Sequence, residues 1–177
     1  MNLQLLPVGK LDGGLLNELA PALADTFGVP CEILTSPLDP EFAFHGERQQ
    51  YHSSEILARM HSLPSRAAWR VLGVTAMDLY IPILTFVFGE AQIGGPCALV
   101  SLHRLRQEFY GLPGDRRLVQ QRLLKEAVHE IGHTMHLTHC DDYRCAMAAS
   151  HAVEWIDLKG SGLCPECQGK TFSPANL

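Results

Sequence analysis

The feature that most constrains this chain is a group of histidines within 11 positions, at His129, His133, His136 and His139. The segment 129–133 has the sequence His-Glu-Ile-Gly-His. Residues four apart lie on one side of an α-helix, about 6 Å from each other, so two imidazoles can share one metal ion. Glu130 can then reach a water molecule on the metal without binding the metal itself. We therefore predict a helix that carries two zinc ligands, His129 and His133, and a catalytic base.

The residues around these histidines follow a helical pattern. The stretch from Arg116 to about Met135 has no Gly or Pro before Gly132, and Asp115 is a suitable N-cap. One apolar stripe recurs every four residues, at Val119, Leu123, Ala127, Ile131 and Met135. His129 lies roughly 200° around the helix axis from this stripe. We expect the stripe to pack on the core and the two histidines to face a cleft. The alternative, ordinary histidines on an amphipathic helix, buries several imidazoles without partners.

Two histidines compete to be the third ligand. In a continuous helix, His136 would lie about 10 Å along the axis from His129, too far for zinc bonds of about 2 Å. A chain that turns after Met135 can instead bring His139 back to the metal, so we predict His139 as the ligand. Three imidazoles leave room for water and a substrate carbonyl, and zinc lowers the pKa of that water to about 7. With Glu130 as general base, this predicts hydrolysis of peptide bonds.

Four cysteines predict a second metal site, of the closed kind in which four thiolates hold a structural zinc ion: Cys140, Cys145, Cys164 and Cys167. Disulfides are the alternative. Cys140 directly follows His139, and adjacent side chains of an extended backbone point in opposite directions, so one dipeptide can serve two metals. We expect the structural zinc to order the C-terminal segment and to anchor His139.

The composition of the chain indicates which kinds of partner it can bind. The formal net charge of −5 argues against nucleic acid, and we interpret the six basic residues between Arg104 and Lys125 as a solvated surface. No signal-peptide pattern and no membrane-spanning apolar run is visible. We therefore expect a cytoplasmic monomer without membrane partners. Thiols in a reducing compartment more often bind metals than form disulfides. Cys31 and Cys97 stand alone, and we expect both to be buried as small apolar residues.

The remaining pattern predicts an α+β fold in which helices pack on a sheet. The expected strands are Leu3–Val8, Glu32–Thr35, Arg70–Val74, Leu84–Phe88 and Ala98–Leu102. The other expected helices are Leu15–Phe27, interrupted by Pro21, Glu47–Leu63 and a short one at His151–Leu158. We expect one domain over residues 1–177. Residues 1–135 form its N-terminal subdomain, which ends with the active-site helix, and residues 136–177 an irregular C-terminal subdomain with the four-cysteine site.

The segment His129–Cys140 resembles the extended metzincin consensus H-E-x-x-H-x-x-G-x-x-H. Together with the following Cys145-Ala-Met147 and Cys164-Pro-Glu-Cys167, it is similar to the archaemetzincin family in particular. The segments 83–92 and 100–106 also resemble archaemetzincin sequences. The resemblance implies a compact metzincin-like fold with a mixed twisted sheet, one catalytic and one structural zinc, and peptidase activity on peptides or proteins.

The family likeness also implies roles for two further segments. It places Met147 in a turn beneath the catalytic site, although without the resemblance Met147 would be interpreted as a gap-filling core residue. It also implies that the strand Ala98–Leu105 forms the edge of the cleft, where an extended peptide can pair with it.

One position departs from the consensus, because His136 occupies the place of its glycine. A histidine at positive φ costs about 1 kcal/mol. Its ring can also occlude or bind the zinc, so the alternative function is a metzincin-fold peptide-binding protein with weak or no proteolysis. A third hypothesis, a zinc-ribbon-like interaction or nucleic-acid module, predicts a basic patch near the cysteines. The segment 141–170 instead has five acidic and three basic residues.

Overall fold

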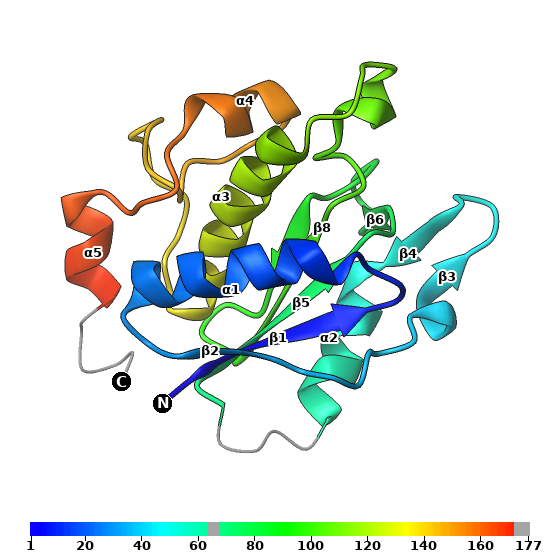
Figure 1. Cartoon of the computed structure of the whole chain (residues 1–177), viewed down its shortest axis with the longest axis horizontal. Coiled ribbons are helices and arrows are strands. Elements are labelled where there is room, and N and C mark those ends of the chain that lie inside the picture. Colours follow the sequence, from blue (N-terminus) through cyan, green and yellow to red (C-terminus); the bar gives the residue numbers. More distant parts are fainter. Residues whose placement is uncertain (64–67, 172–177) are drawn as a thin grey trace.

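A five-stranded mixed sheet forms the middle layer of the structure (Figure 1). The structure, a computed structural model, describes residues 1–63 and 68–171. The sheet has the order β2-β1-β5-β8-β7, and only β7 runs antiparallel to its neighbour. Its strands are β1 (Leu3–Val8), β2 (Cys31–Ile33), β5 (Arg70–Thr75), β7 (Gly89–Ala91) and β8 (Cys97–Ser101). A small second sheet contains β3 (Phe44–His45), β4 (Gln50–His52) and β6 (Leu79–Tyr80).

Helices cover both faces of the large sheet. The helices are α1 (Gly13–Phe27), α2 (Ser53–Ser62), α3 (Arg116–Thr134), α4 (Val153–Leu158) and α5 (Pro165–Thr171), with short 3-10 turns at Glu41–Ala43 and Gln107–Tyr110. α1 and α3 pack on one face and α2 on the other. Strand β8 shows why both faces need cover, because Ala98 and Val100 face α3 whereas Cys97 and Leu99 face α2. The predicted α+β class is confirmed.

The predicted apolar stripe of α3 is confirmed, because all of its members are buried: Val119, Leu123, Ala127, Ile131 and Met135. Asp115 caps the helix by accepting a hydrogen bond from the Leu118 N–H at 3.0 Å. Among the described residues, no helix combines the length and the apolar character needed to cross a membrane.

Several predicted boundaries were wrong. Pro21 does not interrupt α1, because it lies on the exposed side of a helix whose other side is buried. The helix expected at Glu47–Leu63 begins only at Ser53, because residues 50–52 pair with β3 and β6 instead. The strand expected at Leu84–Phe88 is irregular apart from a single bridge at Val87, and Gly89–Ala91 pairs with β8. Helix α5 was not predicted. Residues 64–67, and residues 172–177 of the predicted C-terminal subdomain, lie outside the described residues.

Candidate metal and catalytic site

Helix α3 places two imidazoles side by side. His129 and His133 lie one turn apart, and their Nε2 atoms are 3.1 Å from each other. The Nδ1 atom of His129 lies 2.8 Å from the carbonyl oxygen of Ala146, and that of His133 lies 2.7 Å from the carbonyl oxygen of Leu137. A ring that donates its Nδ1–H to a carbonyl keeps a lone pair on Nε2. Both rings therefore keep their Nε2 lone pairs close together, which is the arrangement that a shared metal ion requires.

The chain turns after Met135, as the sequence predicts. α3 ends at Thr134, and His136 has a φ of 61° in the left-handed region. The N–H groups of His136 and Leu137 donate to the last carbonyls of the helix, each at 3.1 Å. This reversal brings the ring of His139 to within 5.2 Å of the His129 ring, centroid to centroid. Ring nitrogens of His129, His133 and His139 all lie within 4.8 Å of one another.

This group of three histidines fits a zinc ion. Zinc–nitrogen bonds of about 2.0–2.1 Å in a tetrahedral arrangement separate the nitrogens by about 3.3 Å, close to the 3.1 Å between His129 and His133. Burial lowers the pKa of each of the three imidazoles, and that of His129 well below its ordinary value. The neutral imidazole that results is the form that binds metals.

Glu130 lies beside this group, between α3 and the edge strand β7. Its side chain is buried, and burial raises the pKa of its carboxyl well above the ordinary value, with nearby Glu126 as a further cause. Gly89 makes the space for it. A Cβ at Gly89 would lie 2.7 Å from Cγ and Oε1 of Glu130 and 2.6 Å from the carbonyl oxygen of Leu99. Only glycine therefore allows this carboxyl group to lie under the strand.

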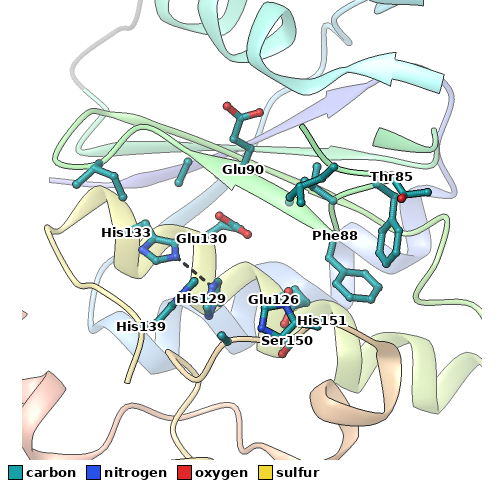
Figure 2. Close-up of a pocket in the computed structure, with 17 residues that line it drawn as sticks. Thr85, Phe88, Glu90, Glu126, His129, Glu130, His133, His139, Ser150 and His151 are labelled. Carbon is teal, nitrogen blue, oxygen red and sulfur yellow. Dashed lines mark hydrogen bonds between the residues drawn. The ribbon is translucent and has the colours of Figure 1, made fainter. Parts of the chain in front are cut away.

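A cavity of about 550 Å³ opens beside the three histidines. Figure 2 shows it between strand β7 with the preceding segment, helix α3, and the loop that contains Ser150 and His151. Its apolar lining comes mainly from β7 and the segments on either side of it, namely Leu84, Phe86, Val87, Phe88, Ala91 and Ile93. The carboxyl group of Glu90 points away from the histidines (Figure 2), and the Ser54 hydroxyl donates to it at 2.7 Å.

The implied cleft edge at Ala98–Leu105 was wrong. β8 lies inside the sheet, where Ala98 is paired with Leu72 of β5 and with Ala91 of β7. The free edge next to the cavity is β7. The error has a simple cause, because a mostly apolar strand of five buried residues is typical of the interior of a sheet, whereas β7 has only three residues, including a glycine and a glutamate.

His136 lies against the turn between β7 and β8. Its ring occupies the space that a Cβ at Gly94 would need, and the Gly94 N–H donates to the carbonyl oxygen of His133 at 3.1 Å. His136 is exposed, and it is not among the described residues that line the cavity. The positive φ that the consensus glycine implies is therefore present, and the ring is directed to the glycine turn.

The four cysteines also come together. Sulfur atoms of Cys140, Cys145, Cys164 and Cys167 lie within 4.8 Å of one another. Zinc–sulfur bonds of about 2.3 Å in a tetrahedron separate sulfurs by about 3.8 Å, which equals the 3.8 Å between Cys140 and Cys164. All six cysteines are free, and backbone hydrogen bonding at Cys167 lowers the pKa of Cys164. Cys97 is buried as predicted, whereas Cys31 is only half-buried.

Met147 is fully buried and packs with Leu137, Cys145 and Cys167. A Cβ at Gly132 would overlap its sulfur atom, so the glycine within the His129–His133 segment provides the space for Met147. The N–H of Cys140 donates to the Met147 carbonyl oxygen at 3.0 Å, which links this turn to the four-cysteine group.

Two buried charged residues beside the site were missed. Glu126 lines the cavity, and Lys159 pairs with it at 2.7 Å. The position of Glu126, four residues before Glu130 and hence on the same side of the helix, was a usable signal. Lys159 follows a short helix and has no local sequence signal.

Comparison with known proteins agrees with this geometry. The chain is 41% identical over 170 residues to an archaemetzincin of Methanocaldococcus jannaschii, covering 96% of this chain and 92% of that protein. It is similar to the crystal structure of an archaemetzincin from Archaeoglobus fulgidus in complex with malonate, with a TM-score of 0.83, 34% identity, and coverage of 96% and 99%. It is also similar to a zinc-dependent peptidase from Methanocorpusculum labreanum, with a TM-score of 0.86, 28% identity, and coverage of 95% and 98%.

The fold and the histidine-bearing helix define a zinc metallopeptidase of the metzincin kind. The model of peptidase family M54 matches residues 30–171. The chain therefore belongs to peptidase family M54, together with the archaemetzincins.

Proposed function

We propose that this metallopeptidase binds its catalytic zinc through His129, His133 and His139, and that Glu130 is the general base for peptide-bond hydrolysis. The observation that carries the proposal is the convergence of three ring nitrogens within 4.8 Å beside a buried carboxyl group, at the mouth of a cavity. No other group of described His, Cys, Asp and Glu residues, apart from the four cysteines, is arranged in this way.

Different residues of the chain have different roles in the proposed hydrolysis. A zinc ion held by the three imidazoles would supply Lewis acidity, which polarises a substrate carbonyl and lowers the pKa of a water molecule. Glu130 is positioned to accept the proton of the attacking water and to deliver it to the leaving amine. Its buried environment makes its carboxylate a stronger base, because burial disfavours the charged form. The carbonyls of Ala146 and Leu137 hold two of the imidazoles in place.

We further propose that the substrate is an extended peptide that pairs with β7. Residues 88 and 92 bond to β8, through the Phe88 carbonyl oxygen and the Gln92 N–H. Hydrogen-bonding groups alternate along an antiparallel strand, so Gly89 and Ala91 direct theirs toward the free edge. A peptide added there would pass directly over Glu130. The apolar lining of the cavity favours an apolar side chain beside the scissile bond.

The four cysteines are proposed to hold a second, structural zinc. The chain would thus carry two zinc ions, one for each group of ligands. The catalytic site draws on both predicted subdomains, because α3 supplies two histidines and residues 136–177 supply His139. We therefore propose that the chain acts as one catalytic unit. Free cysteines suit a reducing compartment such as the cytoplasm.

The proposal is tested by digestion of a peptide library with zinc-loaded protein, chelator-treated protein, and treated protein to which zinc has been returned. We expect cleavage that is lost with the metal and restored by zinc, with apolar residues enriched on one side of the cleaved bond. Cleavage that survives complete removal of both metals would contradict the proposed chemistry.

Gly89→Ala tests the placement of the base. The new methyl group would collide with Glu130 and with the Leu99 carbonyl oxygen. We expect a displaced carboxyl group and a fall in kcat of about 10²-fold, since small misplacements of catalytic groups cost this much, with zinc content unchanged. Gly46→Ala is the matched control, because no atom lies near its Cβ position. Equal kcat values for the two variants would refute the role of Gly89.

The variant His136→Gly tests whether the protein is an active peptidase or a peptide-binding protein with weak or no proteolysis. Since the His136 ring lies against Gly94 and outside the cavity, we expect kcat/KM to stay within about threefold of the wild type, a change of less than 1 kcal/mol. If His136 occludes the zinc, its removal would instead raise kcat/KM by tenfold or more. Steady-state kinetics on one cleaved peptide distinguishes the two outcomes.

A further inference from the structure

Lys159 is a buried lysine next to the three histidines, with a side chain that is 1% exposed. Its Nζ atom lies 2.7 Å from Oε1 of Glu126 and donates at 3.1 Å to the carbonyl oxygens of both Ala146 and Ala148. Two backbone carbonyls thus accept hydrogen bonds from the ammonium group, and the Glu126 carboxylate lies beside it as the opposite charge. Because the side chain is buried, any influence of Lys159 on the reaction passes through these partners.

These partners belong to the catalytic site. Ala146 and Ala148 flank Met147, so one ammonium group holds the carbonyls on both sides of Met147. The carbonyl oxygen of Ala146 is also the partner of His129 Nδ1, at 2.8 Å. Lys159 thus fixes the acceptor that orients the first histidine. Its Nζ lies 3.5 Å from that Nδ1 atom, and both groups are directed to the same oxygen.

Glu126 joins this turn to helix α3. It lies one helical turn before Glu130 and is 3% exposed. A buried ammonium is costly unless it is paired and hydrogen-bonded, and Glu126 supplies the opposite charge. The position of Lys159 is fixed from its own backbone as well, since its N–H donates to the Trp155 carbonyl oxygen and the Gly160 N–H to that of Arg144.

We propose that Lys159 and Glu126 are a buried positioning pair, which holds the His129 ring and the turn around Met147 in the orientation that binds the catalytic metal. The proposal rests on the catalytic zinc site proposed above. It differs from a purely structural ion pair in one respect: a structural pair stabilises the fold, whereas a positioning pair also changes the affinity of the three-histidine site for its metal.

The test measures the binding of Co²⁺ to metal-free protein by chelator competition and visible absorption. The four-cysteine site is an internal control, because thiolate-to-cobalt charge transfer distinguishes it from the histidine site. In Lys159→Met, which keeps an unbranched side chain one atom shorter and removes all three donors, we expect cobalt affinity at the histidine site to fall about 10- to 100-fold, as is usual for residues that orient metal ligands. Affinity at the four cysteines is expected to fall much less than at the histidines, because Lys159 reaches the cysteines only through the backbone of the turn around Met147.

Lys125→Met is the matched control. Lys125 also donates to carbonyl oxygens of the α4 region, those of Ile156 and Asp157, but it does not contact the turn around Met147. Its removal is expected to leave cobalt affinity at both sites unchanged. An equal loss in Lys125→Met and Lys159→Met would overturn the proposal, because it would show a general effect of removing a lysine.

A double variant distinguishes an effect of the pair on metal affinity from an effect on the stability of the fold. Lys159→Met combined with Glu126→Leu removes both buried charges, an exchange that often preserves or raises stability. We expect this protein to fold, to melt near the wild-type temperature, and still to bind cobalt weakly at the histidines. Wild-type affinity in the double variant would overturn the proposal, and so would failure of both variants to fold, since the pair would then serve the fold alone. A wild-type histidine group that binds no cobalt would instead refute the proposed function.

Discussion

Replacement of Glu130 by glutamine is expected to lower kcat/KM for peptide hydrolysis by about 10²- to 10⁴-fold, the usual contribution of a general base. Glutamine has nearly the same shape, so the three imidazoles and the strand above them stay in place. What it lacks is a carboxylate that accepts the proton of the attacking water. The measurement is steady-state hydrolysis of a peptide identified by the library digest, combined with metal analysis, and zinc content is expected to match the wild type.

Glu47→Gln provides the control for this experiment. Glu47 is exposed and lies in the turn before β4, so the same chemical change there should leave kcat/KM within about twofold. If Glu130→Gln cleaved the peptide as fast as the Glu47 variant, the measured hydrolysis would belong to a contaminant or to another part of the chain.

Cys164→Ser is expected to remove the second metal and much of the order around His139. Structural zinc sites of this kind contribute about 10–16 kcal/mol of apparent binding free energy, which is comparable to the roughly 5–15 kcal/mol that stabilises a whole domain. The sulfur of Cys140, the residue after His139, lies 3.8 Å from that of Cys164. Loss of this metal should therefore also weaken the catalytic site. We expect a large fall in melting temperature and in kcat/KM, measured by calorimetry and peptide hydrolysis.

The matched variant is Cys31→Ser. Cys31 is a half-buried free thiol in β2 and lies outside both groups of metal ligands. It should keep the full zinc content and nearly the full activity. A Cys164→Ser protein that retained the zinc content and the melting temperature of the Cys31 variant would show that the four cysteines do not form a structural site.

The features predicted best from the sequence are those set by local periodicity. The apolar stripe of α3 follows from helical geometry alone, and so does the position of His129 and His133 one helical turn apart. The turn after Met135 follows from a steric argument, since only a reversal brings His139 back. The small strands could not be predicted in the same way. β7 and β4 have three residues each, and their pairing depends on neighbours far along the chain rather than on their own propensity.

The missed parts of the site have a similar cause. Gly89 matters because Glu130 lies under it, and this contact joins positions 41 residues apart. Lys159 matters because the chain after α4 returns to the turn around Met147. No pattern within either segment indicates such contacts. The implied edge at Ala98–Leu105 failed for the opposite reason, because a strong strand pattern marks a strand inside the sheet.

The most direct test of the catalytic site is the zinc content of wild-type protein and His139→Ala after dialysis against a competing chelator. We predict two zinc ions per wild-type chain, one for each group of ligands, and one in the variant, retained by the four cysteines. A His139→Ala protein that kept both ions would contradict the proposal that the turn after α3 delivers the third ligand of the catalytic metal.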